Sequence, residues 1–79
     1  MSKKSYIQLQ LFASLKKFMP AAANNYAIES GITVGALLTR LDVPEDQIKL
    51  VFVDGIKADL ATILAGGERV GIFPPVGGG

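Results

Sequence analysis

The residues whose types and spacing could serve chemistry are the last seven of the chain, Phe73, Pro74, Pro75, Val76, Gly77, Gly78 and Gly79. Glycine has no Cβ, so another protein can approach the three glycines and the terminal carboxyl group closely. Proline lacks an N–H and holds φ at about −65°, so the two prolines end a strand and direct the chain outwards as a stiff stalk. We expect a domain over residues 1–73 and a flexible tail over 74–79 that is thin enough to enter a narrow channel.

The rest of the chain lacks the side chains that most catalytic sites need. Cys and His are both absent, which argues against thiol chemistry and against a zinc, haem or iron–sulfur site. No serine lies in a recognisable nucleophile motif, and no Lys-Ser/Thr and helix follow the glycines, as a phosphate loop would require. We therefore expect no bound cofactor, no metal site and no catalytic residue in this chain.

Composition narrows the class of protein further. The chain has 79 residues, of which 49% are hydrophobic and 19% charged, values typical of one small packed domain. Its formal net charge of +1 provides no field to attract nucleic acid. The apolar runs are much shorter than the roughly 20 residues that cross a membrane, and the absence of cysteine suits a reducing compartment. We expect a cytoplasmic protein that is monomeric when free and binds neither nucleic acid nor membrane.

The hydrophobic pattern predicts five strands and one main helix. In residues 6–12, aliphatic side chains alternate with polar or aromatic ones, as in a strand with one buried face. Val34, Leu37, Leu38 and Leu41 follow the spacing of a helix face, and Thr33 is well placed to cap it. Asp54-Gly55 is a strong hairpin signal. The predicted strands are residues 6–12, 26–29, 50–53, 56–58 and 69–73.

One helix can cover one face of one sheet, so the predicted fold is a two-layer α+β arrangement, with a mixed sheet of four to five strands and the main helix packed across one face. Because the helix joins strands that are too far apart in sequence for a hairpin, we expect a crossover. The first and last strands should lie side by side and parallel at the centre of the sheet. The expected core beneath the helix comprises Ile7, Leu9, Leu11, Val70 and Ile72.

Three phenylalanines and one arginine are candidates for an exposed surface. Phe12 and Phe73 each lie on the side of their strand opposite to the core residues, so their rings could form one exposed apolar patch, which usually marks a partner site. For Phe52 the pattern leaves both orientations open, because both alternating sets of its strand are apolar. Arg69 lies on the same side as Phe73, where a solvated side chain is expected.

The order of these elements, together with "VDG" at residues 53–55 and "GGERVGIFPPVGGG" at residues 66–79, resembles the β-grasp (ubiquitin-like) sulfur carriers. The resemblance is closest to the small subunits of molybdopterin synthases, and it extends over essentially the whole chain. Those proteins typically end in a strand, Phe-Pro-Pro-Val, a small residue and two glycines. Gly77 stands here where Ser or Thr is common in the family.

The resemblance implies a carrier rather than an enzyme. A ubiquitin-activating-like adenylyltransferase would use ATP to adenylate the carboxyl group of Gly79, and sulfur would then displace AMP to leave a thiocarboxylate. The thiocarboxylate would donate its sulfur in the large subunit of molybdopterin synthase. The resemblance places the stalk and glycine positions in a channel of the partner and adds Phe52 to the partner-binding face, which would then comprise Phe12, Phe52 and Phe73.

Other functions with the same ending remain open. A ubiquitin-like modifier would be joined to lysines of other proteins through its terminal Gly-Gly. A carrier for thiamine or another sulfur-containing product would use the same thiocarboxylate. A non-covalent interaction domain would use the sheet face alone and would not need the free glycine end.

Overall fold

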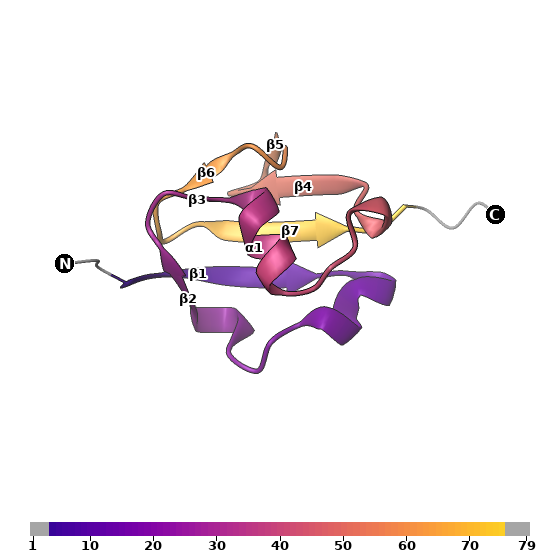
Figure 1. Ribbon diagram of the computed structural model, residues 1–79, viewed down its shortest axis with the longest axis horizontal. Coiled ribbons are helices and arrows are strands. Elements are labelled where there is room, and N and C mark those ends of the chain that lie inside the picture. The colour runs from indigo at the N-terminus through magenta and orange to yellow at the C-terminus, as the bar shows by residue number, and fades with distance from the viewer. Residues whose placement is uncertain (1–3, 76–79) are drawn as a thin grey trace.

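A five-stranded mixed sheet lies at the centre of the computed structural model, which describes residues 4–75 (Figure 1). The order of its strands is β2-β1-β7-β4-β5. Strand β1 pairs in parallel with β7, and the other neighbours are antiparallel. This confirms the parallel central pair predicted from the sequence. The strands are β1 (Lys4–Leu11), β2 (Tyr26–Glu29), β4 (Leu50–Val53), β5 (Ile56–Ala58) and β7 (Arg69–Phe73).

Within residues 4–75 there is one α-helix, α1 (Val34–Arg40), which packs across one face of this sheet (Figure 1). Thr33 caps it as expected, because its Oγ1 accepts a hydrogen bond of 3.1 Å from the backbone N–H of Ala36. Leu37 and Leu38 point into the core. The predicted core is confirmed, since each of the five predicted residues is buried: Ile7, Leu9, Leu11, Val70 and Ile72. The fold is therefore the α+β β-grasp, or ubiquitin-like, arrangement.

Several short elements were absent from the sequence prediction. A two-stranded sheet joins β3 (Ile32–Thr33) to β6 (Ile63–Leu64). Strands of two residues are too short to show an alternating pattern. The 3-10 helices η1 (Ala13–Phe18), η2 (Ala23–Asn25) and η3 (Glu45–Gln47) also lie between the predicted strands and helix. These elements shape the edges of the domain, and the central sheet has the predicted strands with one correction. Strand β1 covers Lys4–Leu11 instead of residues 6–12, so Phe12 lies just outside it.

The turn between β4 and β5 holds the start of β7 in place. Asp54 and Gly55 have φ values of 54° and 80°, the left-handed backbone that a two-residue hairpin turn requires. The backbone N–H of Asp54 donates to the carbonyl oxygen of Arg69 (2.8 Å), and Asp54 Oδ1 accepts from the N–H of Arg69 (3.0 Å). Arg69 is thereby held at the beginning of the strand that leads to the C-terminal stalk.

Candidate functional site

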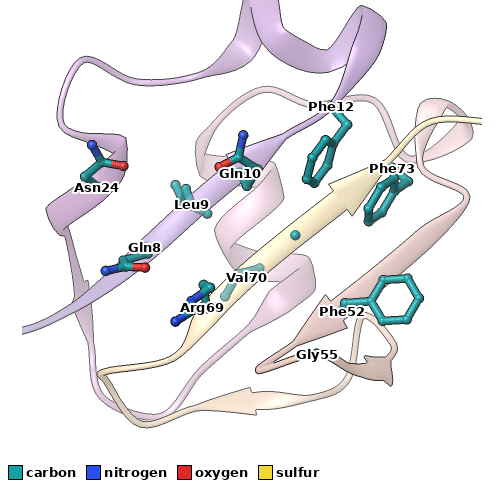
Figure 2. A pocket seen from close by; sticks show the side chains of 11 residues that line it. Gln8, Leu9, Gln10, Phe12, Asn24, Phe52, Gly55, Arg69, Val70 and Phe73 are labelled. Carbon is teal, nitrogen blue, oxygen red and sulfur yellow. The ribbon is translucent and has the colours of Figure 1, made fainter.

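Three phenylalanine rings come together on the sheet face opposite to α1 (Figure 2). Phe12 and Phe73 are stacked, with ring centroids 4.2 Å apart and an interplanar angle of 6°. Phe52 meets Phe73 edge to face, at 5.6 Å and 85°. All three rings are partly exposed. We call Phe12, Phe52 and Phe73 the aromatic cluster. The structure thus resolves the orientation of Phe52, which the sequence had left open.

The local backbone explains how Phe12 reaches its partner. Strand β1 ends at Leu11, but Phe12 stays extended (φ −101°, ψ 154°), and its N–H donates to the carbonyl oxygen of Ile72 at 3.1 Å. Ala13 then takes a positive φ of 53°, which turns the chain into η1. The last bond to β7 therefore places the Phe12 ring beside that of Phe73, two strands from Phe52.

A groove of about 380 Å³ runs along this face, and the aromatic cluster forms part of its lining (Figure 2). Arg69 is the only charged residue among the described residues that line the groove, and its side chain is exposed, as expected. Sequence reasoning missed most of the polar rim, because Gln8, Gln10 and Asn24 show no motif. Gly71 was also missed, although a glycine inside a strand is a visible signal. The lining residues are Gln8, Leu9, Gln10, Phe12, Asn24, Phe52, Gly55, Arg69, Val70, Gly71 and Phe73.

The proposed stalk begins where the sheet ends. Strand β7 stops at Phe73, whose carbonyl oxygen accepts a final hydrogen bond of 2.8 Å from the N–H of Lys49. Pro74 and Pro75 follow outside the strand, and Pro75 is exposed. The ladder therefore ends at the prolines, as their missing N–H groups require. The remaining tail positions of the prediction lie outside the described residues: Val76, Gly77, Gly78 and Gly79.

Aromatic and uncharged polar side chains line most of this surface. Residues 4–75 contain no group of three or more His, Cys, Asp or Glu that could hold a metal ion. In the same range, no helix is long and apolar enough to cross a membrane. Partly exposed aromatic rings beside a polar rim are suited to contact with another protein.

The chain belongs to the ThiS family, whose model matches residues 9–79. Members of this family are small carrier proteins without catalytic activity of their own. They bind no cofactor and are activated by E1-like partner enzymes. The expectations that the chain is a carrier rather than an enzyme and that it binds no cofactor are therefore confirmed. No curated protein sequence matches the chain significantly.

Solved structures agree with this fold. The Haloferax volcanii HVO 2177 protein is 24% identical, with a TM-score of 0.73, over 96% of this chain and 88% of its own. SAMP1 from the same organism is 25% identical, with a TM-score of 0.67, over 95% of this chain and 100% of its own. A Pyrococcus furiosus protein described as a candidate molybdopterin converting factor, subunit 1, is 22% identical, with a TM-score of 0.63, over 91% and 99% of the two chains.

Proposed function

We propose that this chain is a sulfur carrier for molybdopterin biosynthesis and that Gly79 bears the sulfur as a thiocarboxylate. The observation that carries the proposal is the family match through residue 79, combined with Phe-Pro-Pro-Val between β7 and the terminal glycines. Carriers of the thiamine pathway usually lack the double proline, so the ending favours molybdopterin, for either the molybdenum or the tungsten cofactor.

The chemistry requires activation because a carboxylate is a poor electrophile. In the first step of the proposed reaction, an oxygen of the Gly79 carboxylate attacks the α-phosphorus of ATP, and pyrophosphate leaves. Sulfide from a donor then attacks the carbonyl carbon of the acyl-adenylate, and AMP leaves with the bonding electron pair. The partner enzyme supplies the ATP site and the catalytic groups.

In this proposal, the sheet face binds the partner proteins and the tail enters their channel. The aromatic cluster of Phe12, Phe52 and Phe73 binds the E1-like enzyme and, later, the large subunit of molybdopterin synthase. Residues 74–78 enter the channel of the partner, where glycine permits close approach of the surrounding backbone. The support for this division is the position of Phe73, which belongs to the cluster and directly precedes Pro74.

The test is intact-mass analysis of the protein purified from its own cells. We expect a population that carries the mass gain of one oxygen-to-sulfur exchange, and we expect a variant without Gly79 to lack it. Incubation of the thiocarboxylated chain with the large subunit and its pterin substrate should then return the chain to the carboxylate. A chain that stays a carboxylate in cells that make molybdopterin would contradict the proposal.

A second candidate function is protein modification, because the chain is 25% identical to SAMP1, which is named a small archaeal modifier protein. Arg69 is the last basic residue, so trypsin would leave residues 70–79 attached to any modified lysine. Peptides that carry this remnant in a cell digest would support conjugation. If these peptides are absent and the thiocarboxylate is present, the carrier function is supported and protein modification is not.

A further inference from the structure

Gly71 occupies an unexpected position for a glycine, the middle of the central strand β7. Its Cα partners are Gln10 on β1 and Phe52 on β4. The open face of the sheet therefore has no side chain at its centre, directly beside the aromatic cluster. Glycine weakens a strand, because it loses much conformational freedom on folding and has nothing to pack.

The fold itself does not require glycine at this position. The φ of Gly71 lies outside the left-handed region. A Cβ added there would meet Phe12 Cε2 at 3.5 Å and Phe73 Cε1 at 3.7 Å, which are ordinary van der Waals contacts. Gly66 differs on both points, since its φ is 121° and its Cβ would lie 2.5 Å from that of Ser5. Neither backbone nor packing explains Gly71, and such a strand glycine often marks the close approach of another molecule.

We propose that Gly71 is the floor of a slot that receives one apolar side chain of the E1-like activating enzyme, of leucine, methionine or phenylalanine size. The rings of Phe12 and Phe73 lie next to the floor at one end, and Phe52 lies across from it on β4. This inference rests on the proposed function for the identity of the partner. To that function it adds two points: Gly71 makes room for the partner, and the partner inserts a side chain of this size.

The charges on this face indicate what lies beside the inserted side chain. Arg69 precedes Gly71 by two residues and so lies on the same face of β7. Its guanidinium forms no ion pair within residues 4–75, where Asp54 accepts from its backbone N–H. Lys57, the Cα partner of Phe52, adds a second exposed cation to this face. The matching surface therefore carries a carboxylate next to its apolar side chain.

The first experiment measures the dissociation constant with the purified activating enzyme by isothermal titration calorimetry. Gly71→Leu fills the slot and should weaken binding by about 30-fold or more, the effect of losing a central contact. Gly71→Ala fills it in part and should weaken binding less. Gly71→Ala should also melt at the same temperature as the parent or higher, because alanine restricts the unfolded chain. A glycine with a purely structural role would give the opposite result, a lower melting temperature.

A matched control adds the same side chain elsewhere. Ala36→Leu places a leucine on the exposed side of α1, on the other face of the sheet, and should leave binding unchanged. Arg69→Glu should weaken binding, and should also reduce its dependence on salt, because it removes an attraction that salt screens. Equal affinities for the parent and for Gly71→Leu would overturn the slot.

The absence of cysteine from the chain permits a direct test of position. Gly71→Cys introduces the only thiol, and its alkylation can be followed by the mass of this chain. A saturating concentration of the activating enzyme should slow the alkylation of Cys at this position by about 10-fold or more, because a well-packed contact would cover the thiol and exclude water and reagent. An Ala36→Cys control should react at the same rate with and without the partner. Equal rates at position 71 would overturn the proposal.

The outcomes separate the slot from the proposed function. A parent chain that forms the thiocarboxylate while Gly71→Leu binds normally would overturn the slot and leave the carrier function intact. Slot-dependent binding without any thiocarboxylate would support the slot and contradict the sulfur chemistry. A parent chain that neither binds the activating enzyme nor forms the thiocarboxylate would overturn both.

Discussion

The replacement of Phe73 by alanine tests the geometry of the site most directly, because Phe73 is the ring that the other two share. It stacks on Phe12 at 4.2 Å and meets Phe52 edge to face at 5.6 Å. No ring pair joins Phe12 to Phe52 in the described structure. Phe73→Ala therefore removes two ring contacts, whereas Phe12→Ala or Phe52→Ala removes one.

The expected cost follows from these contacts. An aromatic pair contributes about 0.5–1.5 kcal/mol beyond its buried area, so the loss of two pairs costs about 1–3 kcal/mol, to which the lost apolar area adds. Because the Phe73 ring is partly exposed, the total stays below the cost of about 3–5 kcal/mol for truncation of a fully buried phenylalanine. At about 0.05–0.15 kcal/mol per residue, the whole chain is stable by about 4–12 kcal/mol. Phe73→Ala should therefore stay folded, with a melting temperature lower by about 4–8 °C for each kcal/mol lost.

Urea denaturation of single and double variants measures the pairs separately. The Phe12 and Phe73 substitutions should couple by about 0.5–1.5 kcal/mol, because they remove the same contact. The coupling between the Phe12 and Phe52 substitutions should be smaller than that of either direct pair. Additive effects of the Phe12 and Phe73 substitutions would refute the stacked arrangement.

The same variants test whether the cluster binds a partner. Phe73→Ala should weaken the affinity for the activating enzyme by about 30-fold or more, as expected for an aromatic anchor at the centre of an interface. The matched control is Phe18→Ala, which removes a partly buried ring packed against the core but outside the groove. It should lower stability and leave affinity unchanged. Unchanged affinity of Phe73→Ala would remove the cluster from the site.

Three further changes test the core, a glycine with a positive φ and the tail. Leu37→Ala, at a fully buried position of α1, should cost about 2–5 kcal/mol in urea denaturation, and a variant as stable as the parent would show that the core is wrongly assigned. Gly66→Ala should cost more than about 1 kcal/mol, because the φ of Gly66 is 121° and its new Cβ would collide with Ser5; an unchanged melting temperature would contradict the collision. Deletion of Gly79, or an alanine added after it, should reduce ATP–pyrophosphate exchange by the activating enzyme by about 10²-fold through misplacement of the carboxyl group. The deletion should keep the parent's stability, since the described core lies within residues 7–72, and equal exchange by all forms would argue against adenylation of the terminal glycine.

Much of the fold could be predicted from local patterns in the sequence. The alternation through Ile7, Leu9 and Leu11 requires a strand with one buried face, and the apolar spacing after Thr33 requires a helix that covers that face. The Asp54-Gly55 turn could also be predicted from the sequence. Both turn positions need a positive φ, and few residue types adopt that backbone readily. These signals extend over several residues or depend on special backbone chemistry, so they do not need the rest of the chain.

The candidate site depended more strongly on the tertiary structure. Each residue of Leu50–Val53 is apolar, so the sequence could not say which side of β4 faces α1. The register of β4 against β7, in which Phe52 lies opposite Gly71 and Leu50 opposite Phe73, places Phe52 on the open face. The same register and the last bond from Phe12 to β7 bring the rings together. Contacts between strands distant in sequence decide these placements, because the direction of a side chain in a sheet follows from pairing with its neighbours.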